Sequence, residues 1–311
     1  MQFIRGLHNL STPLPACAVT IGNFDGIHLG HQQVLKQLKK VATRKNLPSL
    51  VMLFEPQPVE YFAGDRAPGR ISRLRDKLMF LSTQEIDQLL CLKFDQTLAE
   101  LSAESFIQQI LIEKLNIKHL VIGDDFCFGK NRLGDFAMLQ QAGRSCSFEV
   151  ENTESLLIDH HRASSTRIRA ALADNDFTLA QKNLGRPYSL CGKVSHGKKL
   201  GRELGFPTIN LNMGKQRLIV QGIFAVLVKG IDNRILRGVA SIGTRPTVNG
   251  QNTILEVFIL EFDQDVYQYT VEVVFLHKLR NEEKFASINE LKTQMNQDLI
   301  QAQDFFKSEN K

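Results

Sequence analysis

In the first half of the chain, short apolar runs alternate with segments whose apolar residues recur every three or four positions. The short runs predict buried strands over 17–22, 49–56, 88–94 and 118–125. The periodic segments predict helices over 32–46, 73–84 and 102–116, with Ser102 as the N-cap of the last. Repeated strand-then-helix order is typical of a parallel sheet covered on both faces, with ligands beyond the carboxyl ends of the strands.

The pattern changes after Gly185. From Tyr188 onward the segments are β-like and are separated by glycine, asparagine and proline, over 188–195, 207–211, 222–229, 234–243, 253–262 and 269–279. A closing helix has apolar residues at helical spacing, namely Ile288, Leu291, Met295, Leu299, Ala302 and Phe306. We therefore expect an α/β domain with a parallel, Rossmann-like sheet over 1–185. A small antiparallel β-barrel with a terminal helix should follow over 186–311.

Composition agrees with two globular domains and narrows the setting. The chain has 311 residues, 43% of them hydrophobic, and a net charge of +5, which suits an anionic small ligand or nucleic acid. It contains no run of 18 apolar residues and no apolar N-terminal stretch, so neither a membrane span nor a secretory signal is expected. Five scattered cysteines without a CxxC pair favour reduced thiols over disulfides or zinc, and predict a cytoplasmic protein.

The stretch GNFDGIHLGH, residues 22–31, joins the first predicted strand to the first helix. A helix N-terminus attracts phosphate, and Gly22, Gly26 and Gly30 allow a ligand to approach the backbone closely. His28 and His31 are three residues apart and can hold phosphate oxygens while negative charge develops. A metal site is less favoured because HExxH and nearby cysteines are absent. Core packing is the remaining alternative.

Three further stretches of the first half carry candidate chemistry. ASSTRIRAAL, residues 163–172, is either an anion site with Arg167 and Arg169 or an ordinary capped helix with solvated arginines. GDDFCFGKNRLGD, residues 123–135, suits a site for a ring and phosphates, or is a polar loop with two anchoring phenylalanines. FEPQPVEYF, residues 54–62, adds aromatic side chains at another strand end.

In the second half, GKKLGRELGFPTINL, residues 197–211, is a glycine-rich basic loop that leads into a strand. Such a loop can fold over phosphates, although a basic turn is the simpler interpretation, and it lacks the Walker pattern. Thr208 and Asn210 stand two apart on a strand, so they face one side and can complete a Mg²⁺ shell. Glu256 shares a face with Ile254 and Phe258, and is a candidate general base or a member of an ion pair.

Taken together, the stretches of the first half resemble the FMN adenylyltransferase module of prokaryotic bifunctional riboflavin kinase/FAD synthetases, within the nucleotidylyltransferase superfamily. The resemblance implies that His28 and His31 bind ATP phosphates and stabilise the transition state, and that Asn23 and Asp125 lie near the nucleotide and its metal. It further implies that the triphosphate is held by Arg162, Ser165, Thr166 and Arg169. The implied flavin contacts are Asp25, Phe54, Pro56, Pro58, Phe62, Asp125 and Phe128.

The second half resembles the riboflavin kinase module of the same family, through Gly-x-x-x-Gly-Arg-x-x-Gly-Phe-Pro-Thr-x-Asn. The resemblance implies that Thr208 and Asn210 bind Mg-ATP and that Glu256 deprotonates the ribityl 5′-hydroxyl of riboflavin. The implied ATP contacts in the loop are Gly197, Lys198, Gly201 and Arg202. Departures from the usual family pattern are Gln57, Cys127, Ile209, Ser241, Phe258 and Gln268, and they concern mainly the flavin contacts.

The resulting hypothesis is an enzyme that converts riboflavin to FMN and FMN to FAD. Its expected cofactor is Mg²⁺, its co-substrate is ATP, and its partners are small molecules rather than nucleic acid or membrane. One alternative is an adenylyltransferase with a degenerate regulatory barrel, which the intact Thr208, Asn210 and Glu256 argue against. Another is an RNA-binding or synthetase-like protein, but a dense basic patch and an anticodon-binding segment are missing. The oligomeric state is left open.

Overall fold

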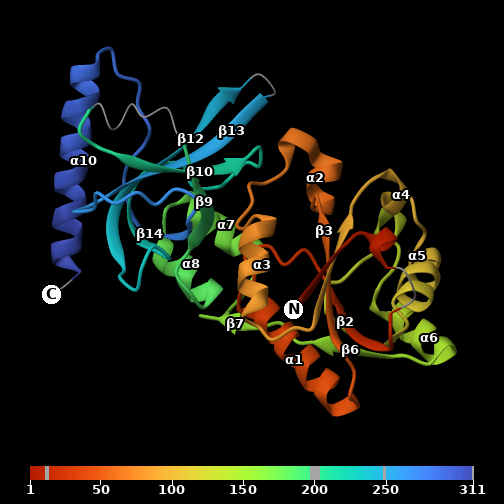
Figure 1. The fold of residues 1–311 in the computed structure, drawn as a ribbon. Coiled ribbons are helices and arrows are strands. Elements are labelled where there is room, and N and C mark those ends of the chain that lie inside the picture. The colour runs from red at the N-terminus through yellow and green to blue at the C-terminus, as the bar shows by residue number, and fades with distance from the viewer. Residues whose placement is uncertain (11–13, 197–203, 248–249, 310–311) are drawn as a thin grey trace. The chain divides into compact units, whose positions relative to one another are not determined.

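The computed structural model describes residues 1–10, 14–196, 204–247 and 250–309 (Figure 1). These form two compact units, each with its own hydrophobic core. Unit 1 comprises Met1–Pro68 and Lys77–Ser164, and unit 2 comprises Gly69–Asp76 and Ser165–Lys311. The segment Gly69–Asp76 therefore belongs with the second unit, although unit 1 continues on both sides of it in sequence.

Unit 1 is built on a six-stranded, all-parallel sheet with the order β1-β4-β3-β2-β5-β6. Its strands are β1 Gln2–Arg5, β2 Cys17–Ile21, β3 Ser49–Glu55, β4 Gln88–Lys93, β5 Ile117–Gly123 and β6 Glu149–Thr153. The four inner strands are those that the apolar runs predict. The edge strands β1 and β6 were missed because polar, exposed residues interrupt their short sequences. An edge strand needs fewer buried residues than a central one.

The main helices of unit 1 follow the strands. They are α1 Leu29–Lys45, α2 Pro58–Ala63, α3 Leu74–Ser82 (whose first three residues belong to unit 2), α4 Gln96–Ala99, α5 Ala103–Ser105 and α6 Phe136–Cys146. The predicted helix over 102–116 is present, capped by Ser102, but continues from α5 as a π-helix, Phe106–Lys114. Short 3-10 turns occupy Leu7–Asn9, Gly64–Arg66 and Lys130–Arg132, and a two-residue hairpin pairs β7 Leu157–Ile158 with β8 His161–Arg162.

From Ser165 onward, unit 2 consists of two helices followed by a closed, six-stranded barrel. The helices are α7 Ser165–Ala173 and α8 Phe177–Leu184. The strands are β9 Ser189–Ser195, β10 Thr208–Gly214, β11 Gly222–Lys229, β12 Leu236–Thr247, β13 Gly250–Ile259 and β14 Thr270–Arg280. Every pair in the closed order β10-β13-β12-β11-β14-β9 is antiparallel, as the sequence predicts.

The terminal helix α10, Ile288–Ser308, packs on the barrel strands β11, β12 and β14 (Figure 1). Ala302 and Phe306 are buried as predicted, whereas Ile288 is 61% exposed and does not join the apolar face. A buried ion pair links the middle of this helix to β14, with Arg280 Nε 2.7 Å from Asp298 Oδ1. The helix is therefore held by a charge pair as well as by its apolar face.

The segment Gly69–Asp76 completes unit 2. Ile71 lies in the barrel's core cluster, and Arg70 N donates to Arg217 O at 2.9 Å. Asp76 Oδ1 accepts hydrogen bonds from Cys191 N on β9 at 3.0 Å and from Arg73 at 2.9 Å, with the Arg73 and Asp76 side chains each 8% exposed. Burial of this pair makes the segment a fixed part of the barrel.

Candidate active sites

The turn between β2 and α1 is a strained but well-packed loop. Phe24 and Ile27 have φ angles of 48° and 42°, in the left-handed region that bulky and β-branched residues rarely adopt, and Gly26 has a φ of 80°. Such conformations cost about 1–3 kcal/mol each and persist only where the surroundings enforce them. Phe24 is 1% exposed and Ile27 is 0% exposed, so their burial supplies that constraint. Packing of these two side chains therefore stabilises the loop conformation at the start of α1.

His28 is the N-cap of α1. Its Nδ1 accepts a hydrogen bond from His31 N at 3.3 Å, so the neutral ring carries its proton on Nε2. The His28 and His31 rings stack with their centroids 3.7 Å apart. The capping bond thus orients the first histidine, and stacking fixes the second against it, at the positive end of the helix.

His31 is held in its neutral form. Burial lowers its pKa well below the usual 6.5, and the positive charges of His28, Lys77 and Arg162 lower it further. Its Nδ1 is buried and has no hydrogen-bond partner among the described residues. A buried ring nitrogen in a field of positive charge is a suitable partner for a phosphate group or for its proton.

Lys77 is a member of this site that the sequence reasoning missed. Its side chain is 0% exposed, and its Nζ lies 2.7 Å from Asn23 O in the β2–α1 loop. A signal was present in the sequence, because Lys77 lies on the same helical face as Leu74, Leu78 and Leu81. A lysine on the apolar face of a helix is either snorkelling to solvent or bound inside, and here it is bound inside.

The loop after β5 contributes two aspartates. Arg162 places one guanidinium nitrogen 2.9 Å from Asp124 Oδ1 and 2.9 Å from Asp125 Oδ1, and Ser155 donates to Asp124 at 2.7 Å. The Arg162 and Asp125 side chains are 45% and 71% exposed, so a ligand can reach both. The structure thus brings together Arg162 and Asp125, both of which the family resemblance places near the nucleotide.

Sheet topology places these two loops at the same edge of the sheet. The chain runs from β2 through β3 to β4 on one side of β2, and then crosses to β5 on its other side. At such a switch point the connections leave adjacent strands in opposite directions and open a crevice at the carboxyl edge. The loop of residues 22–28 follows β2, and Asp124 and Asp125 follow β5, so both border this point.

The predicted flavin contacts lie at the same edge of the sheet. Phe54, at the end of β3, and Phe62, on α2, both contact the ring of Phe94, which follows β4, at 5.8 Å and 5.7 Å between centroids. Tyr61 contacts Phe94 at 5.4 Å. Phe62 is 67% exposed despite these contacts, so it offers a supported aromatic surface to a ligand. Phe94 is a second residue that the sequence reasoning missed.

The other predicted flavin contacts are divided between the core and the loops. Phe128 is buried and stacks on Phe126 at 5.7 Å, and Asp25 is 2% exposed within the β2–α1 loop. Pro56 follows β3, and Pro58 opens α2. Between them, Gln57 caps α2 and forms a capping box with Glu60. Where the family often has histidine, Gln57 therefore serves as a helix cap.

Ser165, Thr166 and Arg169 lie on the first turns of α7, in unit 2. Thr166 is exposed, and Arg169 Nε donates to Gly69 O at 3.0 Å. The predicted helix opening is confirmed, while the assignment of these side chains to ATP stays a prediction.

The barrel carries a row of polar side chains across four strands. Register pairs Ser195 with Asn210, Asn210 with Glu256, and Glu256 with Ser241. Paired residues of antiparallel strands point to the same side of the sheet. Thr208, two residues before Asn210, shares that side, so the structure brings Thr208, Asn210 and Glu256 together.

This row lies on the outer, half-exposed face of the barrel. The neighbours Leu211, Leu255 and Val257 alternate with it and are fully buried inside. The apolar row that contains Glu256 is therefore not a sealed core, and the cost of burying a carboxylate there is small. Gly197, Lys198, Gly201 and Arg202 lie outside the described residues.

Two of the departures from the family pattern lie beside this barrel. Phe258 contacts Phe206 edge to face at 5.3 Å. Gln268 has a φ of 72°, the left-handed conformation that the usual glycine adopts more easily, and its N–H bonds Val194 O at 3.1 Å. The turn is therefore present, but Gln268 adopts a backbone conformation that is strained for a residue other than glycine.

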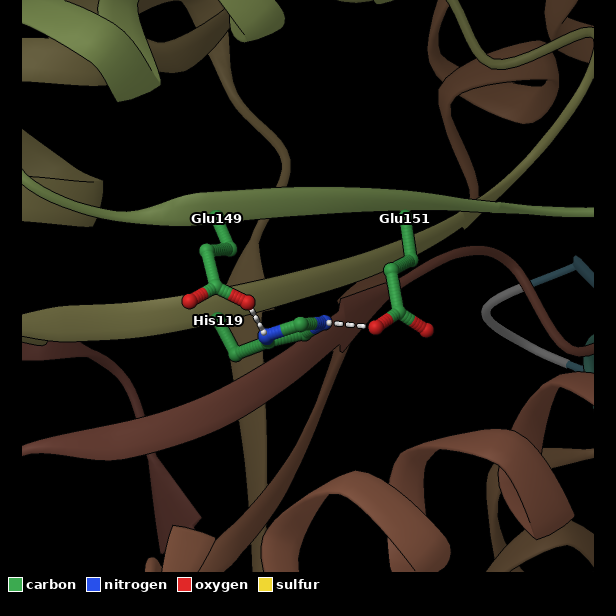
Figure 2. Close-up of side chains that lie close together, drawn as sticks. All are labelled: His119, Glu149 and Glu151. Carbon is green, nitrogen blue, oxygen red and sulfur yellow. Dashed lines mark ion pairs between the residues drawn. The ribbon is translucent and has the colours of Figure 1, made fainter.

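A third group of chemical side chains lies at the amino-terminal half of β5 and β6. Figure 2 shows the fully buried His119 ring between Glu149 and Glu151, at 3.3 Å and 3.2 Å from the two ring nitrogens. One ligand atom from each lies within 4.8 Å of the others, as a metal would need. However, Lys45 lies 2.6 Å from Glu149 and Arg44 lies 3.1 Å from Glu151, so both carboxylates are already neutralised. We interpret the group as a network of ion pairs that links α1 to strands β5 and β6.

Comparison with known proteins covers both halves of the chain. The family description FAD synthetase matches residues 11–167, and riboflavin kinase matches residues 184–306. A bifunctional riboflavin kinase/FMN adenylyltransferase of Haemophilus influenzae is 50% identical over 99% of this chain and 100% of that protein. One from Escherichia coli is 47% identical over 98% of each.

One solved structure aligns along almost the whole chain. It is described as a macrolide-efflux protein from Streptococcus pneumoniae, is 30% identical, and has a TM-score of 0.76 over 97% of this chain and 99% of that one. Across the described ranges, no helix of this chain has the length and apolar character needed to cross a membrane.

Proposed function

The chain belongs to the family of bifunctional riboflavin kinases/FMN adenylyltransferases, and from that premise we propose how its residues divide the two reactions. The enzyme phosphorylates riboflavin to FMN with ATP, and adenylylates FMN to FAD with release of pyrophosphate. The observation that carries this conclusion is the match of both modules, in order, to relatives that are 50% and 47% identical along almost the entire chain.

We propose that residues 1–185 carry adenylyl transfer and residues 186–311 carry the kinase reaction. The two family matches support a division in this region, because one ends at residue 167 and the other begins at residue 184. The kinase barrel additionally uses Gly69–Asp76, which packs in its core and bonds β9. The kinase fold thus depends on a segment that comes earlier in the chain.

For adenylyl transfer, the phosphate of FMN attacks the α-phosphorus of ATP and pyrophosphate leaves. His28 offers its Nε2–H at the N-terminus of α1, and neutral His31 adds a second ring nitrogen. Both hold phosphate oxygens as charge develops, so positioning and charge neutralisation lower the barrier. Arg162 and Asp125 lie near the nucleotide, and Phe54 and Phe62 contact the flavin ring. The triphosphate roles of Ser165, Thr166 and Arg169 stay predictions.

For the kinase reaction, the ribityl 5′-hydroxyl of riboflavin attacks the γ-phosphorus of ATP. Glu256 accepts the hydroxyl proton, and its place on the half-exposed face lets a substrate reach it. Thr208 and Asn210 fit a Mg²⁺ ion bound to ATP, because a hydroxyl and an amide oxygen on one half-exposed face are oxygen ligands, and Asn210 donates to Thr208 O through Nδ2 at 3.3 Å rather than through that oxygen. When bound, Mg²⁺ neutralises charge on the ATP phosphates.

A flavin assay tests the proposal. Purified protein is incubated with riboflavin, ATP and Mg²⁺, and the flavins are separated by chromatography. We expect FMN first and FAD after it. If FAD forms only when FMN is supplied, the result supports the adenylyltransferase activity and refutes the kinase activity. If no new flavin forms, both proposed activities are refuted.

A further inference from the structure

Lys77 is an ionisable side chain of unit 1 that the two reactions leave without a role. An ammonium group that is 0% exposed is costly to bury unless it is bound by polar groups. Its Nζ donates to Asn23 O at 2.7 Å, a charge-assisted bond to a carbonyl. Helix α3 would be equally stable with a lysine at its surface. The burial of Lys77 is therefore better explained by its contact with the β2–α1 loop.

The contacted carbonyl belongs to the peptide that leads into Phe24. That residue has a φ of 48°, and its ring lies 5.1 Å from the ring of His31, which stacks on His28 at 3.7 Å. A fixed Asn23 carbonyl sets the orientation of the next peptide, and so the position of the Phe24 ring. Lys77 thus connects to the histidine pair through one hydrogen bond and two ring contacts.

We propose that Lys77 is a positioning residue for adenylyl transfer, which pins the β2–α1 loop through the Asn23 carbonyl and thereby holds His28 and His31 in register with the phosphates. The inference rests on the proposed role of the two histidines. The Lys77 charge also lies near His31 and contributes to its lowered pKa, so it helps keep that ring neutral. Position and charge are separate contributions, and different substitutions remove them.

The test compares three variants of the full chain. Lys77→Met removes both the charge and the hydrogen bond, whereas Lys77→Gln removes the charge and keeps an N–H donor, on a side chain shorter by one atom, for the same carbonyl. Arg75→Met is the matched control, because it removes a charge from an exposed position of the same helix. For each variant, kcat and KM for FAD formation from FMN are measured against pH. Riboflavin kinase activity and thermal unfolding of the same sample report on the fold.

We expect Lys77→Met to lower kcat for FAD formation at least ten-fold, with kinase activity unchanged. Lys77→Gln should regain several-fold of that loss. In both variants the acid limb of the pH profile should move to higher pH, because loss of a positive charge raises the pKa of His31. Arg75→Met should match the wild type in rate and pH profile.

Three results would overturn the inference: a Lys77→Met rate within two-fold of wild type, a Lys77→Gln rate no better than that of Lys77→Met, or an unshifted acid limb in both variants. If Lys77→Met does not fold, the acid limb of Lys77→Gln decides alone. Failure of the underlying role is separable, because His28→Ala and His31→Ala would then retain FAD formation. If those variants lose it while Lys77→Met does not, Lys77 alone is excluded.

Discussion

Replacement of Asp76 by asparagine tests whether Gly69–Asp76 is a structural part of the kinase barrel. The carboxylate accepts from Arg73 through both oxygens, at 2.9 Å and 3.0 Å, and from Cys191 N at 3.0 Å. Asparagine has nearly the same shape and keeps one acceptor oxygen. It removes the negative charge and leaves the Arg73 guanidinium without its carboxylate in a site where both side chains are 8% exposed.

The expected loss of stability follows from that burial. Removing one member of a buried ion pair costs about 3–5 kcal/mol, because the remaining charge stays desolvated. A typical domain has a free energy of unfolding of about 5–15 kcal/mol, so the loss is a large share for unit 2. With a urea dependence of about 2 kcal/mol per molar, the midpoint of unit 2 should fall by roughly 1.5–2.5 M.

Hydrogen exchange read by mass spectrometry at increasing urea can follow the two units separately. The chain has no tryptophan, so fluorescence would not separate them, whereas peptides from β9 and from β2 report on each core. We expect the opening free energy of β9 peptides to fall by the amount above. Asp232→Asn is the control, since its pair with Arg234 is exposed in the same unit. Equal protection of β9 in the two variants would refute the reasoning.

Three further predictions concern the two sites and pH. In His28→Ala, FAD formation should be lost while FMN accumulates, as flavin chromatography would show, and loss of both activities in a folded variant would contradict separate sites. In Glu256→Gln, FMN formation should stop while supplied FMN is still converted to FAD, and an unaffected kinase rate would remove Glu256 as the base. The free energy of unfolding should fall as pH drops below about 6.5, because burial lowers the pKa of His31 and of His119 and the unfolded chain takes up the protons first. Urea midpoints at several pH values would check this, and His119→Gln should have the weaker pH dependence.

Periodicity predicted the elements with the strongest local signal. The inner strands and the barrel strands are rich in apolar residues and are bounded by turn-forming residues. Burial of one or both of their faces is therefore visible in the sequence. It did not predict β6, where Glu149 and Glu151 stand in a strand that is buried only in part. It also placed Ile288 on the buried face of α10, although this side chain in the first turn of the helix is 61% exposed.

The candidate residues were predicted to different degrees. His28 and His31 were identified because glycines and a strand-to-helix junction surround them within ten residues. Lys77 and Phe94 were missed because neither belongs to a conspicuous stretch, and each reaches its partners only through the fold. Lys77 binds a carbonyl 54 positions away, and Phe94 contacts aromatic rings from strand β3 and helix α2.

By itself, the sequence determined the two-part architecture and the reaction class, since these depend on local periodicity and on short stretches, and it supplied candidate site residues that stay predictions. Tertiary structure alone decided which charges are buried and which residues meet. Strand register placed Asn210 opposite Glu256, and packing joined Asp76 to a backbone N–H 115 positions away. Such contacts depend on strand order and on the desolvation of particular groups, which are properties of the folded chain and not of any local pattern.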